Sequence, residues 1–285
     1  MEREINSTIT VLAGTGKSGR RIAALLRAQG HGVRVASRSG EVRFDWADPV
    51  GWPAVTDGVR ALYLVAPDDP APLRPFLVAA AEAGVERVVL LSGRGGPEAW
   101  RGRFGHAMAV AEEAVRAAGP AWTIARANNF MQNFTEDLWH QPVLDGRLAL
   151  PSAGVPEPFV DLDDVAAVVA RLLTGDGHAG RIYELSGPTA PTFADAVATI
   201  AAATGRPIRY TDLTPDEYVA ELRAAGLDDR GVGELAGLFA VVRDGVIATP
   251  TADVERLLGR PARSFADWVA RTAPSGVWSA ERVPG

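Results

Sequence analysis

Small residues between an apolar stretch and a helical pattern could bind an anion. The apolar stretch is 8–12, the small residues are 13–19, and apolar side chains recur at helical spacing over 22–26. Glycines let backbone N–H groups approach a ligand closely, and a helix N-terminus adds roughly half a positive charge. The pattern predicts a strand, a tight turn and a helix that bind the pyrophosphate of a dinucleotide. The residues expected to do so are Gly14, Thr15, Gly16, Lys17, Ser18 and Gly19.

Two other interpretations of this loop stay open: a loop that binds a nucleotide triphosphate, and a turn that binds nothing. Gly16, Lys17 and Ser18 resemble the end of a nucleotide-triphosphate loop, but that motif needs a glycine where Val11 stands. The dinucleotide motif itself has a glycine where this chain has Ala13, a difference of one methyl group. A glycine-rich turn that binds nothing is the second alternative.

The end of the next apolar stretch indicates which dinucleotide is bound. The run 31–38 reads as a short buried strand that ends in Ser37 and Arg38. Sites for NAD usually place Asp or Glu here to bond the ribose 2′-hydroxyl, whereas an arginine accommodates a 2′-phosphate. Arg38, assisted by Ser37, therefore favours NADP(H), unless Arg38 is only a solvated loop residue.

Composition narrows the class of ligand. The 285 residues carry a net charge of −6, the arginines are scattered, and there is no cysteine. These features disfavour nucleic acid and exclude disulfides, thiolate metal sites and cysteine nucleophiles. The four dispersed histidines give no metal site, and we find no apolar signal core and no membrane-length apolar run. We expect a cytoplasmic protein, a monomer or homodimer, that binds a small molecule and no membrane.

Alternating apolar runs and helical patterns predict the fold. Strands are expected at 8–12, 31–38, 41–45, 62–67, 87–91 and 122–125, with helices at 72–83 and 104–118 among those between them. Strands separated by helices imply βαβ units, hence an α/β fold with a Rossmann-like doubly wound parallel sheet. Ligands bind such sheets beyond the carboxyl ends of the strands. Further cofactor contacts are therefore expected from Asp45, Trp46, Ala66 and Ser92.

The chain changes character near residue 130. We assign 1–130 to an NADP-binding Rossmann domain and 131–285 mainly to a smaller C-terminal α/β substrate lobe, which can return one strand or helix to the first sheet. A helix over 165–173 is expected to be capped by Asp163 or Asp161. The remaining expected elements are helices at 193–204, 215–225, 234–242 and 265–271 and strands at 181–185 and 208–210.

Several separated motifs together resemble one family. They are 13–19, Ser37-Arg38, Phe44-Asp45, 91–93, 122–126, 130–133, 159–161 and 255–261 followed by Phe265. Over residues 8–272 the chain is similar to the NmrA-like group of atypical short-chain dehydrogenases/reductases. Its likeness is greatest to NADPH-dependent quinone-reductase-type members, including actinobacterial proteins that tailor aromatic natural products such as polyketides. The resemblance implies a Rossmann domain, a substrate lobe and NADP(H) as cofactor.

The usual catalytic pair of short-chain dehydrogenases is missing. That pair is Tyr-x-x-x-Lys, in which the lysine lowers the tyrosine pKa so that the tyrosine can protonate a carbonyl. Lys17 is the only lysine, and none of the four tyrosines has a lysine four residues later. Hydride transfer without an enzyme acid is the better hypothesis, and it suits quinones because water can protonate the reduced oxygen.

Two residues are candidates for catalysis. The resemblance places the family's serine, near the nicotinamide, at Ser92; the alternative is a serine that bonds its own backbone. His106 lies near the start of the helix where the missing pair should be, and an imidazole is a suitable proton donor near neutral pH. Its alternative is a solvated histidine at a helix start. No Gly-x-Ser-x-Gly elbow of a serine hydrolase occurs.

Residues after the last Rossmann strand are expected to wall a pocket for a small aromatic substrate. They are Asn128, Asn129, Phe130 and Met131, with Trp139 and His140 as candidates for the far side. Aromatic residues at such places are equally often core.

The first hypothesis is an NADPH-dependent oxidoreductase that reduces a quinone or related conjugated aromatic. An NADP(H)-sensing regulatory protein without turnover, and a natural-product tailoring enzyme with little net use of cofactor, remain as alternatives.

Overall fold

The computed structural model describes residues 8–100 and 102–279. The described chain divides into two compact units. The first takes in the residues up to Gly96 together with 106–127 and 162–184. The second takes in 97–105, 128–161 and the residues from Leu185 on.

The first unit is built on a seven-stranded sheet of order β3-β2-β1-β4-β5-β6-β8. The strands are β1 (Thr8–Leu12), β2 (Val33–Ser37), β3 (Val42–Arg43), β4 (Val59–Val65), β5 (Arg87–Gly93), β6 (Ala121–Ala127) and β8 (Arg181–Leu185). The strands from β3 through β6 pair in parallel. The strand order reverses between β1 and β4, and a parallel sheet with this order binds its ligand outside the carboxyl ends of the strands at that point. The predicted Rossmann-like α/β class is confirmed.

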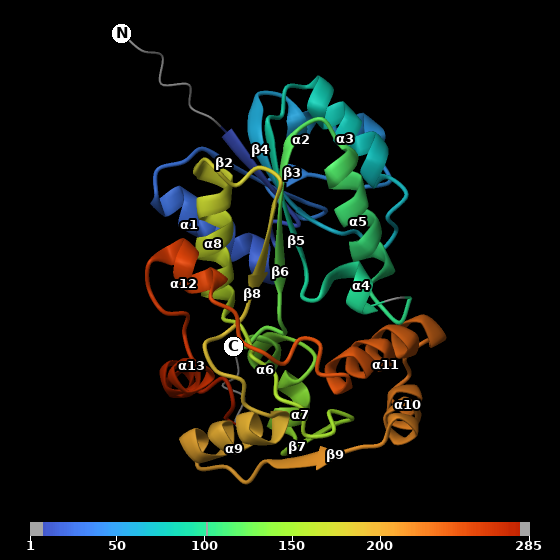
Figure 1. The fold of residues 1–285 in the computed structure, drawn as a ribbon, viewed down its shortest axis with the longest axis vertical. Coiled ribbons are helices and arrows are strands. Elements are labelled where there is room, and N and C mark those ends of the chain that lie inside the picture. Colours follow the sequence, from blue (N-terminus) through green and yellow to red (C-terminus); the bar gives the residue numbers. More distant parts are fainter. Residues whose placement is uncertain (1–7, 101, 280–285) are drawn as a thin grey trace. The chain divides into compact units, whose positions relative to one another are not determined.

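Helices cover both faces of this sheet (Figure 1). The helices are α1 (Lys17–Ala28), α2 (Pro53–Thr56), α3 (Leu73–Glu82), α5 (His106–Ala117) and α8 (Leu162–Thr174). On one face α1 packs against α8, and on the other α3 packs against α5. Because the strands are buried on both sides, they are nearly continuous in apolar residues, as in Leu62-Tyr63-Leu64 of β4.

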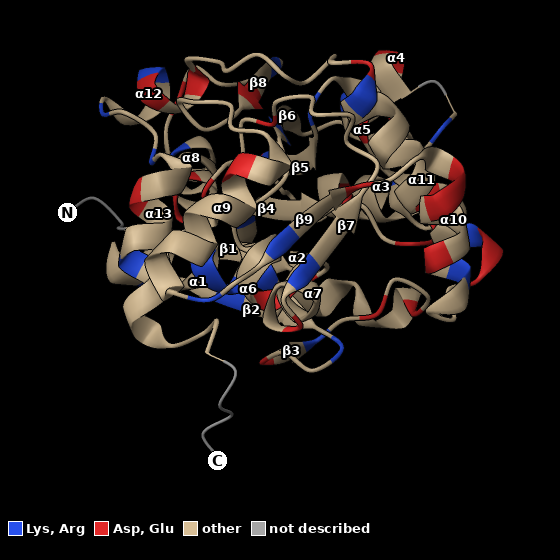
Figure 2. Cartoon of the chain, turned by 90° about the horizontal axis from the view of Figure 1, so that it is seen from below, with Lys and Arg blue, Asp and Glu red and all other residues tan. Residues whose placement is uncertain are grey.

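The second unit combines helices with a two-stranded parallel ribbon. Its helices are α6 (Asn133–Glu136), α7 (His140–Leu144), α9 (Phe193–Thr204), α10 (Pro215–Ala224), α11 (Asp229–Arg243), α12 (Asp253–Leu258) and α13 (Phe265–Thr272). All residues of α4 (Gly96–Trp100) except Gly96 also belong to it. The ribbon pairs β7 (Arg147–Leu150) with β9 (Arg209–Asp212). Arg147 lies opposite Arg209 in this register, and Figure 2 shows the basic residues side by side on the two strands.

Aromatic rings form the core of the second unit. Phe134, Phe159 and Phe193 are fully buried. Their rings meet one another and those of Trp139 and Phe265 at centroid distances of 4.8–6.5 Å, mostly edge to face. Edge-to-face contacts let the positive edge of one ring meet the negative face of another. Trp139, a candidate for the far side of a pocket, therefore packs as a core residue.

Elements that the sequence did not predict are short. They are α2, α4, α6, α7, α12 and β7, each of four to six residues, too few for a clear period. The predicted helix 165–173 begins three residues earlier, at Leu162. Of the two predicted capping residues, Asp161 directly precedes the helix, whereas Asp163 lies in its first turn. The helix predicted at 234–242 begins at Asp229, because Asp228 accepts a hydrogen bond from the Gly231 backbone and caps it.

Candidate functional site

The turn between β1 and α1 is shaped by three glycines, of which Gly14 and Gly19 have no room for a side chain and Gly16 has little. A Cβ on Gly14 would lie 2.7 Å from Val35 Cγ1 and 2.8 Å from the Val11 carbonyl oxygen. A Cβ on Gly19 would lie 2.8 Å from the Gly14 Cα, and one on Gly16 would lie 3.1 Å from the Ala13 carbonyl oxygen. The close packing of turn, strand and helix is what a dinucleotide loop requires, so the fold of this loop fits a bound pyrophosphate.

The start of α1 is open to an anion. The first turn of α1 carries no acidic residue, and its N-cap, Gly16, contributes no side chain. No carboxylate in this turn therefore competes with a phosphate for the positive end of the helix. The Tyr63 hydroxyl donates to Ser18 Oγ at 2.8 Å and fixes the first turn from beneath. Burial raises the pKa of Tyr63 well above its usual range, so this phenol stays protonated.

A cavity of about 520 Å³ lies at the carboxyl ends of β1, β2, β3 and β4. Seven of the predicted cofactor residues line it: Thr15, Gly16, Ser37, Arg38, Asp45, Trp46 and Ala66. Gly14, Lys17, Ser18, Gly19 and Ser92 are not among its lining residues. Gly14 and Gly19 are buried and shape the turn.

Arg38 stands on the wall of this cavity with an exposed side chain. Within residues 8–100 and 102–279 its guanidinium makes no hydrogen bond or ion pair. Beside it Ser37 is held in place, because its Oγ accepts from Thr15 Oγ1 at 3.0 Å and from the Ser39 backbone N–H at 3.2 Å. A cation without a protein partner can turn to an incoming anion without first losing an ion pair.

Sequence reasoning missed several lining residues, among them Ser39, Pro67, Asp68 and Asp69. Each lies at the end of a predicted strand or within two residues after it, and that position was the signal that could have identified them. Asp45 and Asp69 use a carboxylate oxygen to hold their own turns, accepting from the Ala47 and Ala71 backbone N–H groups at 3.0 Å.

Aromatic side chains hold part of the cavity wall. Trp46 lines the cavity, and its ring meets Phe44 at 4.9 Å and Phe76 at 5.1 Å, both edge to face. Phe76 is fully buried in α3, so it anchors the half-buried Trp46 to the core. The cavity thus combines an apolar aromatic wall with one free guanidinium.

Ser92 lies at the carboxyl end of β5 and is almost fully buried. Its hydroxyl donates to Glu112 Oε1 of α5 at 2.9 Å. Arg126 of β6 grips the same carboxylate with two bonds, Nε to Oε1 at 2.9 Å and Nη2 to Oε2 at 2.7 Å, and Arg116 adds a bond of 2.8 Å to Oε2. The Ser92 hydroxyl therefore uses its hydrogen in the bond to Glu112. Its oxygen can still accept a hydrogen bond through its lone pairs.

The buried cluster of Ser92, Glu112 and Arg126 extends to a second carboxylate, that of Glu184. Arg126 Nη1 donates to Glu184 Oε1 at 3.3 Å, and Arg94 Nε lies 3.7 Å from Glu184 Oε2. Burial opposes the charge of Arg126, but hydrogen bonds and attraction from Glu112 and Glu184 outweigh it and raise the pKa of the guanidinium. Gly96 packs directly on this guanidinium, where a side chain would collide with it.

The other predicted residues lie in different surroundings. His106 is the first residue of α5 and its side chain is exposed. The Asn128 amide is buried and donates to Glu157 Oε1 at 2.8 Å and to the Ile247 carbonyl at 3.1 Å. Met131 is fully buried in the aromatic core, whereas Asn129 and Phe130 are half-buried. A role for these residues in a pocket stays a prediction.

His140, the other candidate for the far side, has its ring Nε2 3.0 Å from the Val277 carbonyl oxygen. This bond ties α7 to the segment after α13 and accounts for the histidine structurally.

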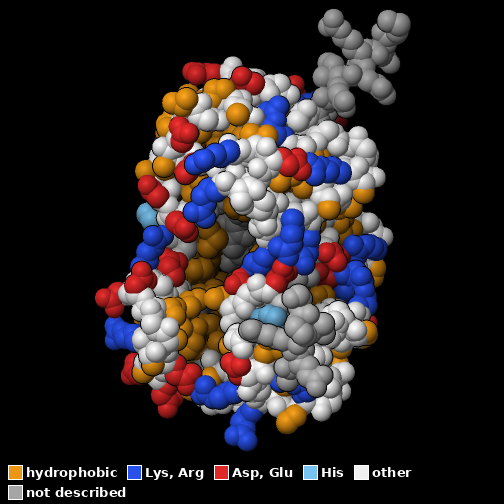
Figure 3. Space-filling view, turned by 180° about the vertical axis from the view of Figure 1, so that it is seen from behind, with side chains coloured by type: hydrophobic (Ala, Val, Ile, Leu, Met, Phe, Trp, Pro, Cys, Tyr) orange, Lys and Arg blue, Asp and Glu red, His pale blue; other side chains and the backbone are white. Residues whose placement is uncertain are grey.

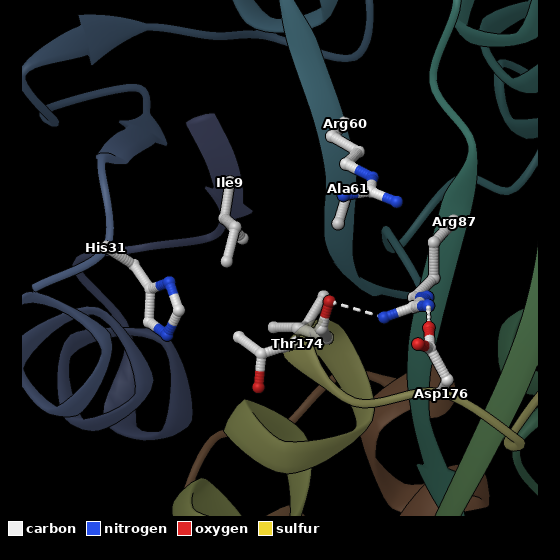
Figure 4. Close-up of a pocket in the computed structure, with 8 residues that line it drawn as sticks. Ile9, His31, Arg60, Ala61, Arg87, Thr174 and Asp176 are labelled. Carbon is white, nitrogen blue, oxygen red and sulfur yellow. Dashed lines mark hydrogen bonds and ion pairs between the residues drawn. The ribbon is translucent and has the colours of Figure 1, made fainter. Parts of the chain in front are cut away.

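A second cavity, of about 130 Å³, lies at the opposite edge of the sheet, where β1, β4 and β5 begin (Figure 4). Arg87 spans it, donating to the Leu173 carbonyl at 2.8 Å and to Asp176 at 3.0 Å. None of the predicted cofactor residues lines this cavity. We therefore assign the expected cofactor only to the cavity at the carboxyl ends of the strands.

Surface charge fits the expected small ligand. Basic and acidic side chains are intermixed on the face shown in Figure 3, with no broad basic area. In the described part of the chain no group of histidine and carboxylate side chains could hold a metal ion. No described helix has the length and apolar character to cross a membrane.

Comparison with known proteins places the chain in a family. It is 32% identical to an uncharacterised oxidoreductase, YesF, of Bacillus subtilis strain 168, over 93% of this chain and 95% of that protein. It is 33% identical to a (4-alkanoyl-5-oxo-2,5-dihydrofuran-3-yl)methyl phosphate reductase of Streptomyces griseus, over 93% and 98%. The NADPH-dependent quinone oxidoreductase QOR2 of Escherichia coli, solved with NADPH, has the same fold, with a TM-score of 0.75 and 21% identity over 92% of this chain and 99% of that one. No family model matches the chain.

The chain belongs to the NmrA-like group of atypical short-chain dehydrogenases/reductases. The family predicted from the separated motifs is thereby confirmed.

Proposed function

We propose that this protein is an NADPH-dependent reductase of a quinone or related conjugated aromatic, working without a Tyr–Lys pair. The general class, an NAD(P)H-dependent reductase, follows from relatives that are named oxidoreductases and reductases. The observation that carries the NADPH part is Arg38: an exposed guanidinium, unpaired among the described residues, on the wall of the cavity beside the glycine loop.

Each part of the cavity has a role in binding. The turn around Gly16 and the start of α1 bind the pyrophosphate, and Ser37 and Arg38 bind the 2′-phosphate. The wall of Phe44 and Trp46 supports the flat adenine ring. When bound, the dinucleotide supplies the hydride, and the protein supplies position and charge.

The proposed class of hydride acceptor follows from the absence of a Tyr–Lys pair in the sequence. The only lysine lies in the glycine loop, and the phenol nearest that loop, Tyr63, is buried and donates to Ser18. A substrate whose reduction places charge on an oxygen that water can protonate needs no such pair. The Streptomyces relative is named a reductase of a 5-oxo-2,5-dihydrofuran, an unsaturated lactone, and such conjugated acceptors belong in the same test.

For the chemical step we propose two residues. Ser92, with its hydrogen donated to Glu112, positions the cofactor or substrate through its oxygen and does not act as an acid. His106, exposed at the start of α5, is the proposed proton donor. Asn128, Asn129, Phe130 and Met131 remain the proposed contacts to a small aromatic substrate.

The binding test compares Arg38→Ala with Arg60→Ala. Both changes remove one exposed arginine, but Arg60 pairs with Glu86 and lines the cavity at the opposite edge of the sheet. Calorimetric titration should show NADPH affinity falling about tenfold to a hundredfold in Arg38→Ala, the size of one charge-assisted hydrogen bond, with NADH affinity nearly unchanged. Arg60→Ala should bind both coenzymes as the wild type does. Equal losses for NADPH and NADH in Arg38→Ala would contradict the role of Arg38.

The turnover test measures NADPH oxidation with a panel of quinones and unsaturated lactones. Oxidation with matching formation of reduced product supports the proposal. Tight NADPH binding with no turnover on any member favours the sensing protein, and product formed without matching loss of NADPH favours the tailoring enzyme. Both Ser92→Ala and His106→Gln should lower turnover, and His106→Gln should leave NADPH affinity within about twofold, a difference near the scatter of independent sites.

A further inference from the structure

A ring-sized cavity lies within the second unit, between α10, α11 and the residue that follows β7. Its volume is about 170 Å³, and it is separate from the cavity at the glycine loop in both lining residues and elements. An apolar cavity of roughly 150 Å³ is large enough to take up benzene. The space therefore suits a single six-membered ring.

Most of the lining is apolar and rigid. Pro151 and Pro215 contribute rings, and Ala236 and Ala240 contribute small side chains one turn apart on α11. Phe239 and Tyr218 are both buried and meet edge to face at 5.3 Å and 76°. Walls of this kind bind a flat ring and order few side chains on doing so, which keeps the entropic cost of binding low.

The end of α11 adds charge at one side of the cavity. Arg243 lines the cavity and is exposed, and its guanidinium makes no hydrogen bond or ion pair within the described chain. The neighbouring Asp244 is paired with Arg103 at 2.5 Å. These three charges leave one net positive charge, and that charge belongs to the unpaired Arg243.

Tyr218 adds a neutral polar group. Burial, and to a lesser degree the charge of Glu221, raise the pKa of Tyr218 to about 12, so the phenol keeps its hydrogen at neutral pH. Glu221 itself is held by Arg147 through bonds of 2.7 and 3.2 Å. A phenol and a guanidinium both donate hydrogen bonds, so the polar groups of this cavity favour a ligand with acceptor oxygens.

We propose that this cavity binds a small aromatic carboxylate, with the ring between Pro151, Ala240 and Phe239 and the carboxylate on Arg243. The planar guanidinium matches a carboxylate geometrically, and the ring gains the apolar contacts. This inference does not depend on the proposed reductase activity.

The probe is benzoate, titrated into the full-length protein by calorimetry, with benzamide and acetate for comparison. Benzoate has about nine non-hydrogen atoms, and ligands of this size reach millimolar to micromolar affinity. Benzamide keeps the ring but not the charge and should bind at least about tenfold more weakly, while acetate should give no saturable heat. No saturable binding of benzoate at tens of millimolar overturns the proposal, as does equal binding of benzamide.

Variants locate the site. Arg243→Gln should weaken benzoate about tenfold to a hundredfold, whereas Arg230→Gln, the same change at the other end of α11, should not. Ala240→Leu should abolish binding by filling the cavity. Benzoate binding unchanged in both Arg243→Gln and Ala240→Leu would place the ligand elsewhere and overturn the assignment. NADPH titration of each variant, which reports on the first unit, and its melting temperature show whether the variant is folded.

Discussion

At the scale of single residues, the glycine loop contains one backbone conformation that its sequence does not favour. Ala13 has φ of +51°, in the left-handed region that costs an alanine about 1–2 kcal/mol and a glycine nearly nothing. The sequence showed that Ala13 replaces a glycine of the motif but not the sign of φ, because the turn is set by contacts of β1 with β2 and α1.

Ala13→Gly should therefore stabilise the protein. Relief of the left-handed strain, less the entropy that glycine adds to the unfolded chain, predicts a gain of about 0.5–1 kcal/mol, or roughly 1–2 °C in melting temperature. Ala24→Gly, at an exposed position inside α1, is the matched control and should lose about 0.5–1 kcal/mol. A loss in both variants would show that the strain at Ala13 is not significant.

Residue types at strand ends could be predicted, and their partners could not. Arg38 was predicted as a cavity residue because it directly follows β2, and it lines the cavity. Ser92 was also placed correctly at the end of β5, but its bond to Glu112 joins two elements and spans 20 positions. Such a pairing depends on how α5 lies on the sheet, which no local pattern specifies.

At the scale of elements, Glu112 connects α5 to β5 and β6 through Ser92 and Arg126. Breaking a buried, hydrogen-bonded ion pair by removing one charge costs about 3–5 kcal/mol, because the remaining charge stays buried. Glu112→Gln should therefore lower the free energy of unfolding by about 3 kcal/mol, since Glu184 still compensates part of the Arg126 charge.

The adjacent residue provides the control for that change. Glu113 pairs with Arg74, but both side chains are largely exposed, so Glu113→Gln should cost less than about 0.5 kcal/mol. Urea unfolding of the two variants measures the difference. Equal losses would mean that the buried cluster contributes no more than a surface pair.

The segment between α8 and β8 carries a pH-dependent contact. His178 bonds the Tyr183 hydroxyl at 2.8 Å, and burial, together with the charges of Arg171 and Arg87, lowers the pKa of its imidazole, while Asp176 opposes this shift. The unfolded chain then binds the proton more tightly than the folded one. Stability should accordingly fall as the pH drops through about 6.5, the ordinary histidine value.

His178→Asn tests this dependence. The variant should lose less melting temperature than the wild type between about pH 7.5 and about pH 5.5, because the other titrating groups are common to both proteins. The quantity compared is the change in melting temperature between the two pH values. A loss of melting temperature that is the same at both pH values does not affect this quantity. Parallel curves for wild type and variant would refute the role of His178.

Long, strongly patterned elements were predicted best. The helices α3, α9 and α13 agree with their predicted ranges to within a residue or so, because each shows a clear helical period and α9 is capped by Gly205. The ribbon of β7 and β9 pairs segments about sixty residues apart. Its first strand is short and lies among prolines, so only the tertiary pairing defines it.

At the scale of the whole molecule, the chain passes between the two units several times. The sequence predicted a boundary at residue 130 and the return of one strand or helix to the first sheet. In the structure α8 and β8 belong with the first unit, apart from Leu185 at the end of β8. This makes the nucleotide-binding unit discontinuous in sequence, and a hydrophobic helix supplied late in the chain completes it.

The fragment 1–130 alone should therefore fail to fold. It lacks α8, in which Leu162, Val165, Val168, Val169, Leu172 and Leu173 are buried. At about 1.5–3 kcal/mol for each large apolar side chain, the lost burial is on the order of 10 kcal/mol, comparable to the whole stability of a typical protein. We expect no cooperative thermal unfolding of the fragment and no heat on titration with NADPH. Joining 160–185 to the fragment through a flexible glycine–serine linker should restore both, because the linker returns α8 to α1 and β8 to the edge of the sheet. If 1–130 alone binds NADPH as the full chain does, α8 is dispensable and the unit is continuous after all.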